Sequence, residues 1–376
     1  MRGIFSVEYY SILISLAKHF RKHRFQVSRE SNDHVKLFQF PIKLSNMKCL
    51  VTGATGFIGS NLVKALITKG FQVRVLIRHS SDSLNLKNLN IEVHYGDLLD
   101  YKLLEKALKG CAFLFHAAAH YSLWDASKDL IYKINVDGTR NILKAAAKTG
   151  IKKVVYTSTV GCIGIPKNRT PGDENTPIDL STLSNSYKHS KYLAEKEALK
   201  FFENGLPVVI VNPSTPIGPG DIKPTPSGKI IVDFLNRKIP AYIDTGLNLI
   251  DVRDCALGHI LALEKGKPGE RYILGNQNLS FHKILLLLEE ITGLKAPKFK
   301  LPYSFAFIAA FVNEVISDYI TKTPPKIPLG GVKMAKHFMY FDSTKAVKEL
   351  GLPQTPIKEA FEAAVAWYRE NGYVRC

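Results

Sequence analysis

Three glycines between a predicted strand and a predicted helix constrain the fold of this chain more than any other feature. Residues 49–52 are expected to form a buried strand, and residues 61–67 repeat apolar side chains at helical spacing. Gly53, Gly56 and Gly59 lie between them at intervals of three. Glycine there allows a tight turn, close approach of backbone to a phosphate, and close packing of helix on strand. The pattern predicts a loop that holds a dinucleotide pyrophosphate at a helix N-terminus.

Arg78 follows the next predicted strand, 71–77, and bears on the choice of cofactor. An NAD site usually carries an acid at this point for the ribose 2′-hydroxyl, whereas an Arg accommodates the 2′-phosphate of NADP. No acid occurs here before Asp82. The sequence therefore favours NADP over NAD. The alternative is that Arg78 is a surface residue stacked over the adenine.

Strands continue to alternate with helices after Arg78. Strands are expected over 91–95, at 112–119 and over 153–159, and a helix is expected to run to Gly150. This order predicts an α/β fold with a Rossmann-type, doubly wound parallel sheet and a smaller, mixed C-terminal lobe. Ligands bind at the carboxyl ends of such strands. The residues expected to contact the cofactor are Gly53, Thr55, Gly56, Phe57, Ile58, Gly59, Arg78, Asp97, Leu98, Ala117, Ala118 and Ala119.

Tyr187 and Lys191 are four residues apart, which places them on one face of a helix. A nearby ammonium favours the phenolate and so is expected to lower the pKa of the tyrosine. A tyrosine tuned in this way can exchange a proton with a carbonyl or an alcohol. The pair alone occurs by chance in many helices. Together with the glycine loop it predicts a nicotinamide-dependent enzyme, with Ser158 and Thr159 at a strand end where a substrate oxygen would lie.

These motifs resemble those of the extended short-chain dehydrogenase/reductases, the NAD-dependent epimerase/dehydratase family. The resemblance rests on the glycine pattern, residues 116–119, Asn135, the strand-end hydroxyls and the Tyr187–Lys191 pair. Within the family, the runs 121–124, 211–219, 221–226 and 242–248 are similar to the hopanoid-associated sugar epimerases and the related dihydroflavonol 4-reductase-like proteins. The resemblance covers about residues 47–373.

The resemblance implies a role for each matching residue. Tyr187 would be the general acid/base, and Lys191 would hold the nicotinamide ribose and lower the tyrosine pKa. Thr159 stands where the family usually has Ser and would bind the substrate oxygen, with Ser158 as the alternative. Pro213 and Ser214 would line the nicotinamide pocket. The resemblance also implies a homodimer.

The substrate is expected to be a small molecule: a sugar, a nucleotide sugar, or a ketone or lipid-linked alcohol. Candidate contacts are Tyr121, Trp124, Asn212, Lys223 and Arg253. The basic residues could clamp a phosphate or could simply be solvated. The aromatic residues could stack on a substrate ring or could belong to the core.

The domain boundaries follow from breaks in the alternation. Residues 1–46 are expected to be an N-terminal extension, with disorder as one possibility. Residues 47–213 and about 240–262 are expected to form the NAD(P)-binding domain, and about 214–239 and 263–376 the substrate lobe. The apolar run 305–312 is expected to form a packed helix. The alternative is an element at a membrane surface, helped by the basic charge.

The net charge is +18, but the chain has no zinc-finger spacing, arginine-rich arm or RNA-binding aromatic motif. Nucleic acid is therefore not expected as a partner. The five cysteines form no Cys-x-x-Cys pair, which argues against a structural zinc site or a disulfide framework. No metal site is predicted. The expected location is the cytoplasm, with peripheral membrane contact as a further possibility.

Two enzymatic outcomes and one other class stay open. A reductase would release its oxidised cofactor in each turnover, whereas an epimerase would oxidise its substrate and reduce it again with the same bound cofactor. Arg78 favours the reductase, and the branch resemblance favours the epimerase. A catalytically silent NAD(P)-sensing protein is the third alternative, and the presence of Tyr187, Lys191 and Thr159 argues against it.

Overall fold

A seven-stranded, wholly parallel sheet forms the centre of the computed structural model, which describes residues 46–122, 128–183, 185–323, 325 and 329–374. The strands lie in the order β3-β2-β1-β4-β5-β6-β9. Their bounds are β1 (Lys48–Thr52), β2 (Gln72–Ile77), β3 (Glu92–Tyr95), β4 (Phe113–His116), β5 (Lys153–Thr157), β6 (Val208–Pro213) and β9 (Arg271–Leu274). The predicted α/β fold with a doubly wound parallel sheet is confirmed. The predicted extension lies outside the described residues, apart from Asn46.

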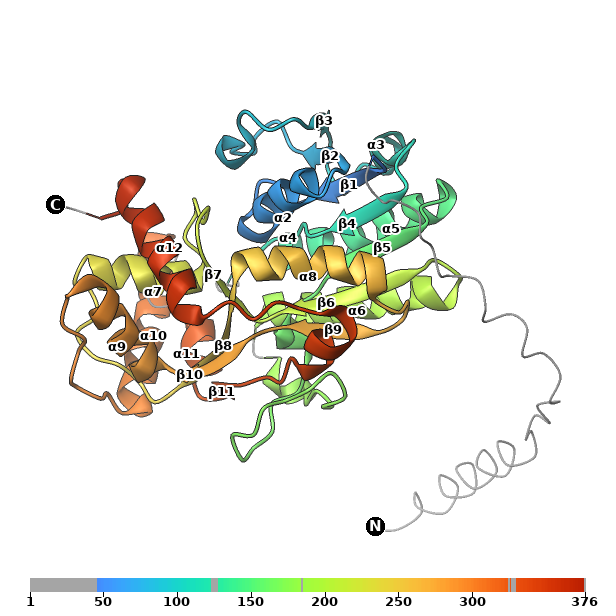
Figure 1. The fold of residues 1–376 in the computed structure, drawn as a ribbon. Coiled ribbons are helices and arrows are strands. Elements are labelled where there is room, and N and C mark those ends of the chain that lie inside the picture. Colours follow the sequence, from blue (N-terminus) through green and yellow to red (C-terminus); the bar gives the residue numbers. More distant parts are fainter. Residues whose placement is uncertain (1–45, 123–127, 184, 324, 326–328, 375–376) are drawn as a thin grey trace, which may run out of the picture. The chain divides into compact units, whose positions relative to one another are not determined.

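Helices cover both faces of this sheet (Figure 1). On one face, α2 (Phe57–Thr68) and α8 (Val252–Lys265) pack against the strands and against each other. On the other face lie α3 (Tyr101–Leu108), α5 (Gly138–Lys148) and α6 (Ser186–Glu203). The central strands are therefore buried on both sides, which accounts for their nearly continuous apolar sequences, whereas the edge strand β3 is mostly exposed.

A smaller mixed sheet and a separate apolar core form the second lobe. The sheet contains β7 (Thr215–Ile217), β8 (Gly246–Asp251), β10 (Gln277–Ser280) and β11 (Phe338–Met339). Its core is filled from α7 (Pro226–Leu235), α9 (Phe281–Thr292) and α12 (Ile357–Glu370). The remaining helices are α4 (Lys128–Tyr132), α10 (Tyr303–Ile316) and α11 (Leu329–Met334).

The chain leaves the large sheet for the smaller one after β6 and later returns to it. β6 ends at Pro213, β7 begins at Thr215 in the smaller sheet, and the chain returns to the large sheet as β9. The predicted domain division stays a prediction. Strand β9, which that division assigns to the substrate lobe, pairs with β6 in the seven-stranded sheet.

The glycine loop shows why the residue type matters at two positions. Gly53 has a φ of +70°, and a Cβ added to it would lie 2.6 Å from the backbone nitrogen of Ala118. A Cβ on Gly59 would lie 2.1 Å from the carbonyl oxygen of Gly53. Any side chain at Gly59 would therefore push α2 away from the loop that follows β1.

Helix α10 differs from the sequence prediction. A helix forms over the apolar run. Among the described residues of this helix, Ala310 alone is fully buried. Its inner side packs on α11 through Ala306, Phe307 and Ala310. The side chains of Phe305, Ile308, Phe311 and Val312 are instead between 49% and 63% exposed. The expectation of a packed helix is therefore wrong for its outer face.

Candidate active site

A pocket opens at the carboxyl ends of β1, β2, β3 and β4, where the strand order changes direction. This is the place where dinucleotides bind in doubly wound sheets. The predicted cofactor contacts that line it are Gly53, Thr55, Gly56, Arg78, Asp97, Leu98, Ala117, Ala118 and Ala119. Phe57, Ile58 and Gly59 form the first turn of α2, beside the pocket. No side chain caps this helix, so its first N–H groups are left for a ligand.

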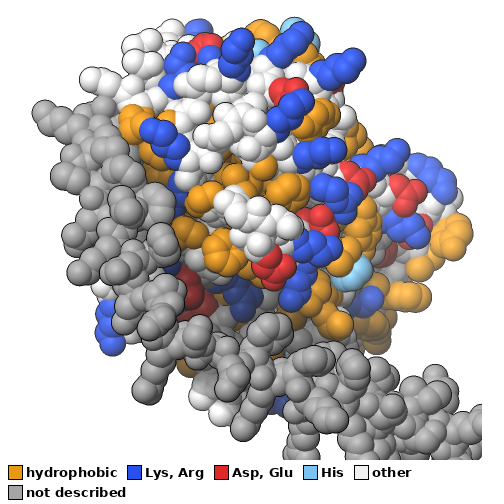
Figure 2. Space-filling model, turned by 90° about the vertical axis from the view of Figure 1, so that its right-hand side faces the viewer, with side chains coloured by type: hydrophobic (Ala, Val, Ile, Leu, Met, Phe, Trp, Pro, Cys, Tyr) orange, Lys and Arg blue, Asp and Glu red, His pale blue; other side chains and the backbone are white. Residues whose placement is uncertain are grey.

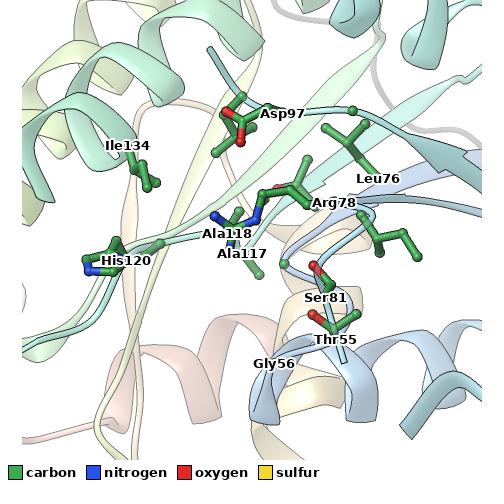
Figure 3. Close-up of a pocket in the computed structure, with 16 residues that line it drawn as sticks. Thr55, Gly56, Leu76, Arg78, Ser81, Asp97, Ala117, Ala118, His120 and Ile134 are labelled. Atoms are coloured by element: carbon green, nitrogen blue, oxygen red, sulfur yellow. Dashed lines mark hydrogen bonds between the residues drawn. The ribbon is translucent and has the colours of Figure 1, made fainter. Parts of the chain in front are cut away.

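Arg78 lies at the rim of this pocket. Figure 3 shows its side chain extending across the cavity, with Thr55 and Ser81 on the side nearest the glycine loop. The carboxylate of Asp82 accepts a hydrogen bond of 3.0 Å from the backbone of Leu84, inside its own turn. Within the described residues, the 78–82 segment thus presents the Arg78 guanidinium and the Ser81 hydroxyl to the cavity. These groups fit a phosphate better than they fit a ribose hydroxyl.

The predicted nicotinamide end carries an orphaned polar atom. The Oγ of Ser214 is buried and has no hydrogen-bond partner among the described residues. Its backbone N–H donates to the Leu274 carbonyl at 2.9 Å, which fixes the residue beside the end of β6. A buried hydroxyl without a partner is costly unless a ligand satisfies it. Together with the glycine cradle, it fits a nicotinamide dinucleotide lying across the strand ends.

Lys191 is held beneath the strand ends. It lies one helical turn after Tyr187 on α6, and it is 3% exposed. Its ammonium donates to the hydroxyl of Tyr156 at 2.9 Å and to the carbonyl of Thr157 at 2.8 Å. Burial lowers the pKa of Lys191 to about 8. The side chain thus carries a positive charge at neutral pH that is easily lost at mildly alkaline pH.

The predicted lowering of the Tyr187 pKa is contradicted. Burial raises the pKa of this phenol well above its ordinary value, and Tyr121 and Cys162 add to the rise. The rings of Tyr187 and Tyr121 pack edge to face, with centroids 4.5 Å apart. Desolvation therefore outweighs the helical proximity of Lys191. Tyr187 carries its proton throughout the neutral range, as a proton donor must.

Thr159 and Ser158 differ in what their hydroxyls do. Ser158 is buried and donates a short hydrogen bond to the carboxylate of Glu195. Thr159 is partly exposed, and its hydroxyl accepts from the backbone N–H of Gly161 at 3.1 Å. Among the described residues, the Thr159 hydroxyl hydrogen has no acceptor. Of the two predicted candidates, Thr159 is the one with a donor left for a substrate oxygen.

Glu195 is the residue that sequence reasoning missed. It is 4% exposed and accepts hydrogen bonds from Ser158 and from Asn212 Nδ2, the latter at 3.0 Å. Its other oxygen accepts from Arg271 of β9 at 3.1 Å. A signal was available, because Glu195 follows Lys191 by four residues and so continues the same helical face.

Asn212 connects this carboxylate to the strand end. It is fully buried, and its amide also donates to the Thr159 carbonyl at 2.9 Å. Its Oδ1 is buried without a hydrogen-bond partner among the described residues, and its role as a substrate contact stays a prediction. It holds the backbone that carries Thr159.

Asn135 and Ser190 brace the Tyr187 segment from the other side. The amide of Asn135 donates to Ser190 Oγ at 2.9 Å, and Ser190 donates to the Tyr187 carbonyl at 2.8 Å. Asn135 also exchanges hydrogen bonds with the backbone of His120 at 2.7 and 3.1 Å. It lies in the π-helical turn η3 (Lys133–Asp137), which directs its side chain inward. The segment that follows β4 and the Tyr187 helix are thus tied together.

The remaining predicted substrate residues have different fates. Tyr121 lies against Tyr187, as described. Trp124 lies outside the described residues. Lys223 is exposed on the lobe. Arg253 is bound by the buried carboxylate of Asp251, with contacts of 2.5 to 3.1 Å, so its charge is already neutralised. Neither Lys223 nor Arg253 makes a described contact with Tyr187.

Charge and metal ligands add little to the site. Figure 2 shows Lys and Arg side chains spread across one face, interspersed with hydrophobic and acidic ones. No group of three or more potential metal ligands occurs among the described residues. The four described cysteines are free and buried.

Comparisons with known proteins agree with this geometry. Residues 49–275 match the NAD dependent epimerase/dehydratase family. A Synechocystis protein provisionally named a dihydroflavonol 4-reductase is 51% identical over 86% of this chain and 95% of its own length. Sterol demethylase protein B of Methylococcus capsulatus is 34% identical over 87% of this chain and all of its own length. The crystal structure of gox2253 is 44% identical, with a TM-score of 0.79 over 88% of this chain and 100% of that one. The family resemblance read from the motifs is thus confirmed.

The Glu195 network gives a prediction for stability. Glu195→Gln should lower the free energy of unfolding by about 1–3 kcal/mol, because buried donors lose a charged acceptor. Urea unfolding would measure this. Glu197→Gln, two residues further along α6, is the matched control, since Glu197 pairs with the half-exposed Arg140 and with Lys200 at the surface. Its cost should stay below about 1 kcal/mol. Equal costs for the two variants would contradict the role given to Glu195.

Proposed function

The chain belongs to the NAD-dependent epimerase/dehydratase family, and on that premise we propose that it is an NAD(P)-dependent oxidoreductase acting on a secondary alcohol or ketone. One observation carries the proposal. The available hydroxyl of Thr159 and the ammonium of Lys191 lie at the end of β5, on the same carboxyl edge of the sheet as the nucleotide pocket, and Tyr187 lies one helical turn before Lys191. This combination suits hydride transfer coupled to movement of one proton.

The residues divide the work as follows in the direction of reduction. A bound nicotinamide supplies the hydride. Thr159 donates a hydrogen bond to the carbonyl oxygen and holds it. Tyr187, protonated because burial raises its pKa, gives its proton to that oxygen as the alcohol forms. The positive charge of Lys191 one turn away stabilises the phenolate that remains until solvent restores the proton.

The cofactor we propose is NADP rather than NAD. The support is the position of Arg78 immediately after β2, with Ser81 and Thr55 lining the same part of the pocket. A guanidinium and hydroxyls suit the three oxygens of a 2′-phosphate. The family name specifies NAD, so this preference is a property proposed for this chain.

A net reduction is the first candidate reaction, and epimerisation of a sugar is the second. An NADP preference favours a reductase, because such a cofactor enters and leaves with each turnover. The epimerases in the family's name, and the resemblance to hopanoid-associated sugar epimerases, favour the second. The names of the two relatives also point to ketones and sterol-like lipids as substrate classes. A silent NAD(P)-sensing protein is the remaining alternative, and it would bind nucleotide without turnover.

We also propose a peripheral contact with an anionic membrane through α10. Helix α10 and the π-helical turn η6 (Ser317–Thr321) together form one apolar helix, Tyr303–Thr321, of 19 residues. By length and composition it could cross a membrane, and 11% of its 18-residue apolar window is buried. Its outer face carries Phe305, Ile308 and Phe311, and exposed lysines flank it at 298, 300 and 322. Apolar side chains flanked by cations suit insertion into the surface of an anionic bilayer. The homodimer stays a prediction that light scattering can test.

Turnover should depend on Tyr187 and on the charge of Lys191. Tyr187→Phe should abolish ketone reduction while nucleotide binding stays within about threefold of wild type. In the wild type, the rate of reduction should fall as pH rises through about 8, where Lys191 loses its proton. Stopped-time assays with NADPH and a panel of ketones would measure both. A silent binding protein would show no turnover in either form, and a rate unchanged well above pH 8 would contradict the role of Lys191.

Arg78 should decide the choice of nucleotide. Arg78→Ala should weaken NADPH binding at least tenfold and leave NADH binding nearly unchanged, because it removes charge-assisted hydrogen bonds to one phosphate. Fluorescence titrations would measure both affinities. Lys87→Ala removes an exposed charge nearby without touching the pocket and serves as the control. Stoichiometric NAD released from denatured wild-type protein would instead indicate an epimerase that retains its cofactor.

Membrane contact should depend on the outer face of α10. Wild-type protein should float with phosphatidylcholine vesicles that contain phosphatidylglycerol, and less with phosphatidylcholine alone. Replacing Phe305, Ile308 and Phe311 together by Ser should reduce the bound fraction at least tenfold, since apolar burial drives insertion. Leu180→Ser, at an equally exposed site elsewhere, is the control. Concentration-dependent self-association that disappears in the triple variant, without vesicle binding, would overturn the proposal.

A further inference from the structure

Lys188 is a buried cation that the proposed mechanism does not use. It follows Tyr187 on α6, and it is 6% exposed. Its backbone N–H caps the helix by donating to Asn185 Oδ1 at 2.8 Å. Its ammonium makes no hydrogen bond or ion pair with any residue in the described part of the chain. The ammonium is not among the fully buried polar atoms that lack a partner, so it reaches solvent from a largely buried stem and is available to pair with a ligand.

The side chain of Lys188 starts beside the turn that follows Thr159, whose hydroxyl is proposed to hold the substrate oxygen. A Cβ built on Gly161 would lie 3.5 Å from Lys188 Cγ, and equally 3.5 Å from Thr159 Oγ1. The stem of Lys188 and the hydroxyl of Thr159 therefore lie on the same side of the short turn η4 (Val160–Cys162). The next residue back along the helix is Tyr187 itself.

A second basic group faces Lys188 from the other lobe. His337 lies just before β11, and burial lowers its pKa, with the charge of Lys188 and then that of Lys336 adding to the lowering. The thiol of Cys162 is the other titratable group that acts on Lys188. No carboxylate among the described residues acts on the Lys188 ammonium in this way. His337 is therefore largely uncharged at neutral pH, and burial also lowers the pKa of Lys188, so the positive charge available beside Tyr187 rests on Lys188.

We propose that Lys188 binds an anionic group of the substrate, a carboxylate or a phosphate, close to the carbon whose oxygen Tyr187 and Thr159 hold. This inference rests on the proposed function and narrows its substrate class. The substrates would be secondary alcohols or ketones that carry an acidic group within a few bonds of the reacting carbon. A compact ammonium binds carboxylate and phosphate oxygens alike, so the two sources share one recognition chemistry.

Such a contact would give the Lys188 ammonium the partner that it lacks among the described residues. In a low-dielectric site, an ion pair with the substrate is stronger than it would be in water. An acidic substrate would therefore be oriented by its anionic group, with its carbonyl facing the two hydroxyls. A neutral substrate would leave the ammonium unpaired and would bind less well.

Binding of small probes to the protein tests this inference without knowledge of the natural substrate. The protein is first saturated with NADPH or NADH, whichever binds more tightly, and nucleotide fluorescence is followed. Benzoate, phenyl phosphate and the neutral benzamide are then titrated in turn. The wild type should bind one or both anions at least tenfold more tightly than benzamide. A preference for benzoate identifies a carboxylate site, and one for phenyl phosphate identifies a phosphate site.

Variants assign the preference to Lys188. Lys188→Met should reduce anion affinity at least tenfold and leave benzamide affinity unchanged, whereas Lys188→Arg should retain most of the preference. Lys196→Met is the matched control, because it removes an exposed lysine from the same helix. Nucleotide affinity should be the same in all variants.

Two failures have distinct meanings. If wild-type protein binds nucleotide but shows no preference for either anion, this inference is overturned and the proposed function stands. The same holds if Lys188→Met keeps the full preference. If the protein binds neither NADPH nor NADH, the proposed function itself fails. The wild-type comparison of benzoate with benzamide needs no variant, so a variant that does not fold leaves the test intact.

Discussion

The approach of helix α2 to strand β1 is the constraint on which the rest of the site depends. The contact is possible only because residue 59 lacks a side chain, since a Cβ there would overlap the Gly53 carbonyl oxygen. With α2 in this position, its first turn points its N–H groups at the pocket. Helix α8 packs beside α2 on the same face of the sheet. Strand β9 and the later elements of the lobe come after α8 in the chain. The absence of a Cβ at Gly59 thus allows both the phosphate-binding position of α2 and the packing of α8 against α2.

Helix α6 does for the chemistry what α2 does for the cofactor. Successive turns of its inner side present Tyr187, Lys191 and Glu195 to the ends of β5 and β6. Tyr187 packs against Tyr121, and Lys191 donates to the Thr157 carbonyl. Glu195 accepts from the buried Ser158 and Asn212. Because all three are on one rigid element, their spacing does not depend on loop conformations. The hydroxyl of Thr159 is then placed by backbone hydrogen bonds to groups that Glu195 anchors.

The sequence allowed prediction of features that depend on local spacing. The glycine loop and the alternation of strands and helices are properties of neighbouring residues, and the structure has them. Features that depend on desolvation could not be read in the same way. The spacing of Tyr187 and Lys191 suggested a lowered tyrosine pKa, but burial sets the direction, and Tyr121 and Cys162 from two other segments add to the rise. Glu195 went unnoticed because its partners are distant in sequence. The exposure of α10 was missed because apolar composition alone does not say which elements will cover a helix.

The return of the chain to the large sheet as β9 has a consequence for folding during synthesis. Strand β6 keeps an open edge until β9 emerges, and between them the chain must supply β7, α7, β8 and α8. The lobe core waits longer still, because α12 closes it and Tyr368 of that helix donates to Asp221 at 2.9 Å. Nascent chains that lack β9 therefore carry an unpaired parallel strand edge, and chains that lack α12 still carry an uncovered apolar face. Such chains are prone to pair with one another. The risk of aggregation therefore falls only when α12 has left the ribosome and packed on the lobe, and not when the individual helices form.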